Sequence, residues 1–509
     1  MKKRNHLTSV ILTLILVLPI AVWANHISID GNVTITDQVA AEDYTHLKFD
    51  ISWENSWRTS SAPNNWDAAW VFAKFNIVGD APDLGWKHCT LSSTDGDHSV
   101  TTDNGVGVTI DAVTVGKGIF IHRSSNTSGN NNWDGTKLRW NYGTDLVADD
   151  AVVDVKVFAI EMVYIPEGSF SLFSGESADL YANFNSINTI DSEDETEVEL
   201  GTITWSMESS WCGAQDAAGS IGGSADLLAA YPKGYKAIYC MKYEISQGQY
   251  VDFLNTLTST QNATRYMTET GYRHGAWGGS QGSRTTNTPD RACNYLSWAD
   301  GLAYADWSGL RPMTELEYEK ICRGSGQAAG TEYAWGDATI HGSAYTIYND
   351  GTATAIVDNS TTAGNCSYNT TDGSIDGPLR CGIFADAYSD RQESGASYYG
   401  VMEMSGNLWE RCITIAKYCW NNSTWNNTGA GSFDGQHGDG VLTGTGFADV
   451  SNWPSPEPAA GSYTAYGSSF RGGNWGSSAA LLRVSARYYA ASPDADRYYY
   501  SGFRAVRTP

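Results

Sequence analysis

Phe470-Arg-Gly-Gly-Asn-Trp475 and Ser501-Gly-Phe-Arg504 enclose the stretch around which the chain is organised. Between them lies a run built largely from Gly, Ser, Ala, Leu, Asp, Arg and Tyr, with a tyrosine doublet at 488–489 and a triplet at 498–500. Consecutive tyrosines in a strand would point to opposite faces, so the run is not an alternating half-buried strand. Tyrosine among small polar residues is typical of recognition surfaces, because its ring offers a large rigid contact area. We interpret this stretch as the working surface and the preceding chain as its scaffold.

The first 24 residues have the pattern of an export signal. Lys2, Lys3 and Arg4 are followed by an apolar segment from Val10 to Val22 and by Ala24, a small residue of the kind found at signal cleavage sites. The apolar segment is too short to cross a membrane comfortably. We therefore expect a bacterial protein that is secreted, periplasmic or at the cell surface, with no membrane span after signal cleavage. A retained N-terminal anchor is the alternative.

The charge balance narrows the choice of partners. The chain has 57 acidic and 32 basic side chains, a formal charge of −25, and loss of the three basic residues of the signal gives 29 − 57 = −28. A chain this acidic repels phosphate backbones, which disfavours nucleic acid as a partner. The 19 tryptophans and 29 tyrosines suit aromatic-rich β structure and surfaces that contact proteins or sugars.

The cysteines and histidines show no metal or redox motif. Export permits disulfides, and an odd count of nine cysteines leaves at least one thiol unpaired or intermolecular. Cys212 with Cys240 and Cys366 with Cys381 are close enough in sequence to pair, but spacing does not fix the connectivity. The sequence contains no C-x-x-C and no H-E-x-x-H, so zinc-ribbon, thioredoxin-like and zinc-protease sites are not indicated.

Residues 25–157 are predicted to form an all-β sandwich. In segments 26–30, 33–36 and 47–53, apolar and polar residues alternate at period two, and Asp, Gly and Asn turns separate the segments. Segments 66–75 and 152–158 are predicted to be further strands. Several short strands at this spacing are typical of a sandwich. Four tryptophans in this region either fill its core, the interpretation that we favour, or form a sugar-binding platform; they are Trp53, Trp57, Trp66 and Trp70.

Residues 158–509 are predicted to form a second, loop-rich domain with few helices. Its acidic run 191–199 is most simply a solvated loop. Ser246 is placed to cap an amphipathic helix that reaches about Asn255. Two further helices are expected at 297–307, ended by Gly309, and at 315–323.

Eight ordered motifs make this second domain similar to a known superfamily. They are Met162-Val-Tyr-Ile-Pro-Glu-Gly-Ser-Phe170, Tyr243-Glu-Ile-Ser246, Ser297-Trp298, Leu310-Arg-Pro-Met-Thr-Glu-Leu-Glu-Tyr-Glu319, Tyr333-Ala-Trp-Gly-Asp337, Gly400-Val-Met-Glu-Met-Ser-Gly-Asn-Leu-Trp-Glu410, Arg471-Gly-Gly473 and Gly502-Phe-Arg504. The domain resembles the formylglycine-generating enzyme, or sulfatase-modifying factor, superfamily. The resemblance implies an α+β fold of C-type-lectin-like architecture, with little regular structure and calcium as a stabilising ion.

The two enzyme types of that superfamily do not match the chemistry of this chain. The copper oxidases use a pair of cysteines shortly after the Arg-Gly-Gly motif, whereas the last cysteine here is Cys419, and a copper(I) site needs soft thiolates. The iron-dependent sulfoxide synthases use a His-x-x-x-His-x-Glu arrangement that the sequence lacks. We therefore expect no copper, no iron and no catalysis; an enzyme with non-standard chemistry on the same fold is the alternative.

A third member type, the variable protein of diversity-generating retroelements, fits better. Mutation of template adenines converts asparagine codons to Tyr, Ser, Asp, Gly, Ala or Leu among others, but never to Lys, Glu, Trp, Met or Gln, and residues 476–501 contain none of those five. A static binding or structural relative is the alternative. The variable region is expected at about 470–507, with ten candidate ligand-binding positions: Gly476, Ser477, Leu481, Tyr488, Tyr489, Asp494, Asp496, Tyr498, Tyr499 and Tyr500.

The framework around these positions is expected to be rigid. We interpret Arg471, Arg483, Arg487 and Arg504 as buried props, with Glu403, Glu410 and Asp337 as possible partners. The resemblance also implies a calcium site at the turn that leads into Trp409. Its expected ligands are the carboxylates of Glu403 and Glu410 and the carbonyl oxygens of Gly406 and Leu408, since calcium prefers hard oxygen ligands. The sequence as a whole predicts an exported, non-catalytic binder of a protein or glycan ligand at a cell surface.

Overall fold

The computed structural model describes residues 27–79, 85–172, 188–194, 196–204, 220–326, 330–386, 388–415, 433–461, 464–490 and 492–509. The expected signal at 1–24 and the cysteines Cys212 and Cys419 lie outside these residues. The described part is mostly β with few helices. None of its helices is long and apolar enough for a membrane crossing.

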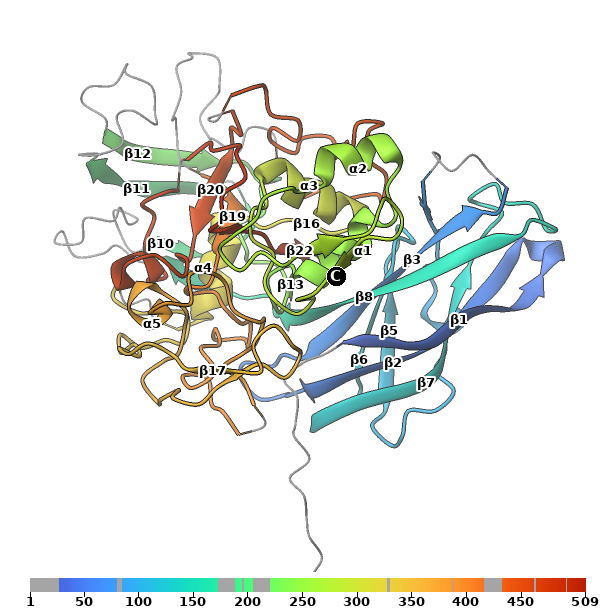
Figure 1. The fold of residues 1–509 in the computed structure, drawn as a ribbon, viewed down its shortest axis with the longest axis horizontal. Helices are drawn as coiled ribbons and strands as arrows, with labels where there is room; N and C mark the ends of the chain where they lie inside the picture. The colour runs from blue at the N-terminus through green and yellow to red at the C-terminus, as the bar shows by residue number, and fades with distance from the viewer. Residues whose placement is uncertain are drawn as a thin grey trace, which may run out of the picture.

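One large sheet runs through the two predicted domains. Its strand order is β16-β22-β13-β8-β3-β6-β5, with the short β4 added on β3. The strands are β3 (Asp67–Ile77), β4 (Lys87–His88), β5 (Val108–Ala112), β6 (Ile119–Arg123), β8 (Val153–Ile165), β13 (Ile238–Met241), β16 (Arg311–Pro312) and β22 (Ala505–Arg507). The boundary expected between residues 157 and 158 falls inside β8, which pairs with β3 on one side and with β13 on the other. Figure 1 shows β8 joining the sandwich strands to the loop-rich C-terminal part.

A second sheet completes a β-sandwich in the N-terminal part. It has the order β1-β2-β7, with β1 at Ser28–Val39, β2 at Tyr44–Trp57 and β7 at Ser128–Trp140. Alternate residues of β2 and β7 meet the large sheet in a core that includes Phe49, Trp53, Trp133 and Trp140. The alternation seen in the sequence therefore corresponds to strands with one buried face.

Strand β3 is buried on both faces, which gives the molecule three layers. Ala69, Val71 and Ala73 face the sandwich core, whereas Trp70 and Phe72 pack against the helices on the other face. The near-continuous apolar run of β3 reflects this double burial. The helices of this layer are α1 (Gln247–Leu254), α2 (Ser259–Arg265) and α3 (Trp298–Trp307), whereas α4 (Glu315–Arg323) lies beside β19 and β20 (Figure 1).

The four tryptophans that we considered as a sugar platform are core or edge residues. Trp53 and Trp70 are fully buried. Trp57 and Trp66 are half-buried, and each carries a cation over its ring, Lys242 at 4.7 Å and Arg58 at 4.0 Å. Core filling is thus confirmed for the two buried rings.

Local signals place the longer helices correctly. Ser246, Ser297 and Thr314 cap α1, α3 and α4, each in a capping box with the third helical residue. Gly309 follows α3 with φ +72°, the left-handed conformation that glycine adopts without strain. The sequence analysis missed α2 and α5 (Asn369–Asp372), which are short and have no apolar periodicity.

The rest of the C-terminal part is built from short pairs of strands. A three-stranded sheet has the order β20-β19-β21, and four two-stranded pairs surround it. Their bounds are β9 (Phe170–Leu172), β10 (Asn188–Ile190), β11 (Thr196–Thr204), β12 (Ser220–Leu227), β14 (Trp277–Gly278), β15 (Thr285–Thr286), β17 (Ile347–Tyr348), β18 (Ile356–Val357), β19 (Trp409–Ile413), β20 (Ser468–Arg471) and β21 (Ser501–Gly502).

The seven cysteines in the described residues are free thiols. The pairing of Cys366 with Cys381 that spacing allowed is not formed. Cys366 packs in an aromatic cluster with Tyr333 and Trp335, whereas Cys381 packs against a different cluster. Proximity in sequence failed as a guide because the intervening loop folds the two residues into separate cores.

The shared sheet makes a prediction about unfolding. Trp70 is fully buried between β3 and α3, and its indole N–H donates to the carbonyl of Ser308 at 2.8 Å. We expect Trp70→Ala to lower the free energy of unfolding by about 3–5 kcal/mol, measured by urea denaturation with fluorescence and circular dichroism. Both probes should report one shifted transition, because the sheet links the two parts. The control Tyr388→Ala, at a ring that is 91% exposed, should change it by less than about 0.5 kcal/mol. Two transitions with only one shifted would contradict the prediction.

Candidate ligand-binding face

Both ends of the terminal stretch meet on one strand. β20 pairs antiparallel with β19 and β21 pairs parallel with it, so that Glu410 lies opposite Arg471 on one side and Gly502 on the other. Residues 472–500 therefore form a loop that leaves and returns to the same three-stranded sheet. The Arg-Gly-Gly and Gly-Phe-Arg motifs, about thirty residues apart in sequence, are the two anchors of this loop.

Close packing explains the glycines of the first anchor. Gly472 and Gly473 have φ of +88° and +75°. A Cβ on Gly472 would lie 2.9 Å from the carbonyl oxygen of Met404, and one on Gly473 would lie 2.6 Å from Cδ1 of Leu482. Only glycine fits here without strain or a shift of the neighbours.

A buried ion network lies beneath the loop. Glu315, at the start of α4, accepts hydrogen bonds from Nη1 of Arg471 at 3.0 Å and from Nε and Nη2 of Arg487 at 3.0 and 2.9 Å. Arg471 also bonds Glu319, one turn further along the same helix. Burial alone would raise the pKa of Glu315, but Arg487 and Arg471 more than offset it and hold that pKa below its ordinary value. The network ties both ends of the segment 471–487 to one helix.

Arg504 secures the second anchor. Its Nε and Nη2 donate to Oε1 of Glu410 at 2.7 Å, and the same guanidinium bonds the carbonyls of Met241, Lys242 and Met402. The role of Arg471, Arg487 and Arg504 as buried props is confirmed, as is Glu410 as a partner. Burial was wrongly predicted for Arg483, which is half-buried. Asp337 was the wrong partner for these arginines: its carboxylate accepts from the backbone N–H of Thr339 in its own exposed turn.

The tyrosines of the loop gather with two other rings into an aromatic band, defined here as Tyr272, Trp475, Tyr488, Tyr489, Tyr498, Tyr499 and Tyr500. Tyr499 stacks on Tyr272 with ring centroids 3.9 Å apart, and Trp475 lies 5.7 Å from Tyr499. Tyr498 stacks on Tyr500 at 5.1 Å, and Tyr488 meets Tyr489 edge-on at 4.7 Å. The five loop tyrosines are half-buried and Tyr272 is 43% exposed. The six tyrosines of the band are thus partly open to solvent, whereas Trp475, at 7% exposure, is buried and supports them.

Of the other five candidate positions, three are at least partly exposed and two are buried. Gly476 is exposed, and Leu481 and Asp496 are half-buried. Ser477 and Asp494 are buried, at 6% and 1% exposure. The Ser477 hydroxyl accepts from the N–H of Asn474, and the carbonyl of Asp494 accepts from Arg411. These two residues therefore shape the loop from inside.

The sequence analysis missed Tyr272 as a member of the face. It lies in a loop more than 200 residues before Tyr499, and the Asn294 side-chain amide donates to the carbonyls of both tyrosines. Tyr272 has φ +45°, a left-handed conformation that tyrosine rarely adopts. No local pattern signals this role, because it depends on a contact between distant loops.

The two carboxylates expected as calcium ligands, Glu403 and Glu410, are buried. Oε1 of Glu403 accepts from the N–H of Gly382 at 2.7 Å, and Glu244 nearby accepts from the N–H of Leu408 at 2.9 Å. The second carboxylate oxygens of Glu403 and Glu410 are buried and have no hydrogen-bond partner among the described residues. Burial, opposed by Arg504, raises the pKa of Glu403 to about 7. The carboxylates of Glu244, Glu403 and Glu410 all interact with Arg504, but among the described residues they do not bring three carboxylate oxygens within 4.8 Å of one another.

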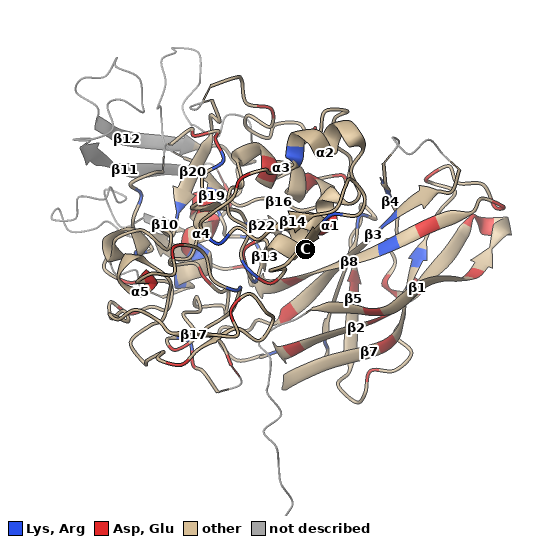
Figure 2. Ribbon diagram, viewed as in Figure 1, with Lys and Arg blue, Asp and Glu red and all other residues tan. Residues whose placement is uncertain are grey.

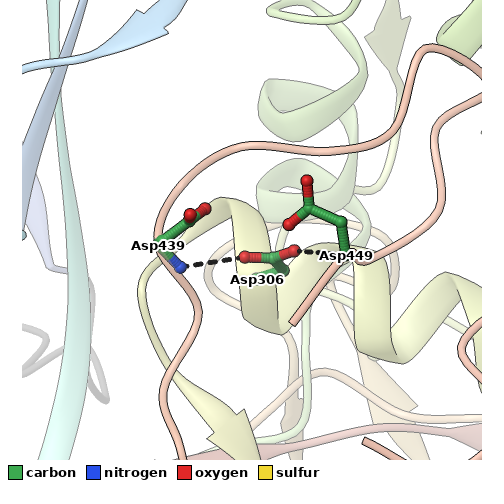
Figure 3. Close-up of side chains that lie close together, drawn as sticks. All are labelled: Asp306, Asp439 and Asp449. Carbon is green, nitrogen blue, oxygen red and sulfur yellow. Dashed lines mark hydrogen bonds between the residues drawn. The ribbon is translucent and has the colours of Figure 1, made fainter. Parts of the chain in front are cut away.

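A second group of three carboxylates, Asp306, Asp439 and Asp449, lies apart from the expected calcium ligands. Asp306, buried at the end of α3, accepts from the N–H groups of Asp439 at 3.0 Å and Asp449 at 3.1 Å (Figure 3). Burial raises the pKa of Asp306 to about 7, although these backbone hydrogen bonds oppose the shift. The other two carboxylates are exposed. The two hydrogen bonds of Asp306 thus attach the segment 438–450 to the end of α3.

Comparison with known proteins places the C-terminal part in context. Residues 211–509 match the family model of the sulfatase-modifying factor enzyme 1-like domain. The formylglycine-generating enzyme of Streptomyces coelicolor is 41% identical over 68 residues, which is 13% of this chain and 21% of that protein. The formylglycine-generating enzyme of Thermomonospora curvata is 41% identical over 56 residues, 11% of this chain and 18% of that protein. The chain thus spans about a fifth of the length of these curated relatives.

The ion network under the loop can be tested at Glu315. Glu315→Gln leaves Arg471 and Arg487 short of a buried partner, so we expect the free energy of unfolding at neutral pH to fall by about 3–5 kcal/mol. Because the folded pKa of Glu315 lies below its ordinary value of 4.5, its stabilising effect is present above that value and is lost as the pH falls through the folded pKa. Denaturation curves at several pH values should show wild type and variant converging only in acid. Glu457→Gln, at an exposed carboxylate, is the control; equal effects of both substitutions would sink the idea.

Proposed function

The chain belongs to the sulfatase-modifying factor enzyme 1-like family, and we propose that it uses that framework as an exported, non-catalytic ligand-binding protein. The observation that carries the proposal is the aromatic band, on a loop whose two ends are clamped to one strand. A recognition surface needs exposed rings on a fixed backbone, because preorganised side chains lose little entropy on binding. We propose a C-type-lectin-like architecture for the domain and a protein or glycan ligand at a cell surface.

We further propose that the loop is a diversified surface of the retroelement type. One observation in support is that residues 476–501 contain no Lys, Glu, Trp, Met or Gln. The other is that buried residues hold the loop while most candidate positions are at least partly exposed. Buried arginines, glycines and carboxylates fix its backbone, whereas most candidate positions face solvent at least in part. A surface that accepts many residue types requires this division, since substitutions away from buried networks are usually tolerated.

Formylglycine generation is the second candidate, because both reported relatives carry that name. The sequence argues against the copper form of that chemistry: no cysteine lies between residues 420 and 509, where the oxidases of the superfamily have their pair. The anchored loop instead presents Gly, Ser, Ala and Leu after the Arg-Gly-Gly motif.

Sequencing the gene across clonal populations tests diversification. We expect substitutions at Gly476, Leu481, Asp496 and the five loop tyrosines, few at the buried Ser477 and Asp494, and none in the control codons 409–413. A reverse transcriptase gene and an asparagine-rich near-copy of the terminal codons should lie nearby. Their absence would favour a static relative. Stoichiometric copper together with turnover of a cysteine-containing sulfatase peptide would reject the binder altogether.

We propose calcium as a structural ion held by Glu403, Glu410 and the carbonyls of Gly406 and Leu408. Millimolar calcium should raise the melting temperature and a chelator should lower it, because an ion that binds only the folded state stabilises it by about 2.7 kcal/mol at a hundredfold excess over Kd. Glu403→Gln should abolish the shift measured by calorimetry. Asp449→Asn, in the unrelated carboxylate group of Figure 3, is the matched control. If Asp449→Asn abolishes the shift and Glu403→Gln does not, calcium binds at the carboxylate group of Figure 3 and the proposed site is wrong.

A further inference from the structure

Strand β8 has an edge that no described strand covers. It pairs with β3 along an uninterrupted register from Val163 opposite Asp67 to Val153 opposite Ile77. On its other side β13 covers only Met162 to Ile165. The nine residues Val153–Glu161 therefore present one unpaired edge among the described residues, about 30 Å long at 3.3 Å per residue.

The register shows which backbone groups point to this edge. The carbonyl of Glu161 accepts from the N–H of Lys242 at 2.9 Å, just beyond β13. In an antiparallel ladder the N–H and C=O of alternate residues point to the same side. Those of Val155, Val157 and Ala159 therefore point to the same edge, and no described backbone group bonds them there.

Two clefts lie along this edge, although β1 also passes close to β8. A cleft of about 1060 Å³ runs along residues 157–161, and a second of about 620 Å³ runs along residues 153–156. Residues of β1 line both clefts, and residues of α1 line the first from the other side. In Figure 1, β8 lies between α1 and β1. The two clefts follow successive parts of the unpaired edge of β8, and together they are called the trough here.

A buried polar group faces the first cleft without a partner. Asn131 is 1% exposed, and neither its Oδ1 nor its Nδ2 is hydrogen-bonded among the described residues. It lies opposite Trp53 in the ladder of β2 and β7, so its side chain lies on the face turned towards the large sheet. A buried amide with both polar atoms unbonded is costly, which suggests that the trough receives a hydrogen-bonding molecule.

The charge of the trough is acidic. The exposed acids along it are Asp30 on β1, Asp154 on β8 and Asp252 on α1. Its cations are Lys156, which lies over the ring of Trp86 at 4.4 Å and also interacts with Asp154 and Asp252, and Arg380, which is buried and bonded to the carbonyl of Ala355. The acids that line the two clefts outnumber these two cations. Figure 2 shows both acidic and basic positions along the sandwich strands. A second copy of this chain, itself at a formal charge of −25, is repelled from such a surface.

We propose that the trough along β8 binds an extended, basic peptide segment, which joins the large sheet as an added strand opposite Val155, Val157 and Ala159. Main-chain hydrogen bonds supply a sequence-independent part of the binding, and lysine or arginine side chains meet the acids on β1, β8 and α1. This site is separate from the aromatic band and does not depend on its function.

The test uses the full-length chain without its signal and an acetylated nine-residue peptide in which lysine and valine alternate. We expect binding by calorimetry that weakens with salt. Two N-methylated peptides are compared, one methylated at the odd residues and one at the even residues. Only one of these sets donates hydrogen bonds to β8, so methylation of that set should weaken binding by about tenfold or more. N-methylation of the other set should be tolerated. Equal loss from both sets, or equal binding of a peptide with glutamate for lysine, would overturn the proposal.

Hydrogen exchange at single residues supplies an internal control without any variant. Peptide binding should slow exchange at Val155, Val157 and Ala159 and leave Phe158 and Ile160 unchanged, since these face β3. Asp154→Asn with Asp252→Asn should weaken binding, and Glu457→Gln should not. No binding, no protection at the three amides, or their protection by a concentration-dependent dimer of the free protein would each refute the added peptide strand.

Discussion

Glu315 bonds two arginines from opposite ends of one segment, and the geometry of the terminal loop depends on that contact. Arg471 closes β20 and Arg487 lies immediately before the tyrosine doublet, yet both guanidinium groups reach the same carboxylate. Separate burial of these charges would be strongly unfavourable, so the segment can only fold in a way that brings them together. The network specifies one conformation of the loop, whatever its net contribution to stability.

The large sheet gives this loop a stiff base. β22, near the end of the chain, lies between β13 and β16, and β13 joins it through β8 to the sandwich. Lys242, at the end of β13, bonds Glu161 at 2.5 Å and lies 3.9 Å from Asp67, so a buried ion group also crosses between the two parts. The N-terminal β unit is therefore a structural support of the C-terminal part and shares its sheet.

The half-buried state of the tyrosines has consequences for recognition. The stacked rings are partly exposed, and their contacts with one another hold them in place before any ligand arrives. The aromatic band and the edge of β8 offer different chemistry: the first offers side chains and the second offers backbone hydrogen bonds in an acidic trough. Substitutions can therefore alter one of these two surfaces without altering the other.

Sequence alone determined the features that depend on neighbouring residues. The capping boxes of α1, α3 and α4, the alternation of β2, and the glycines and arginines that frame the terminal loop all follow from short-range patterns. Tertiary structure decided the rest. Glu315 lies 156 positions before Arg471, Tyr272 joins the band from a distant loop, Ser477 and Asp494 turn inwards, and β8 crosses the expected domain boundary. These outcomes depend on which distant side chains share a core, and periodicity and caps carry no information about that choice.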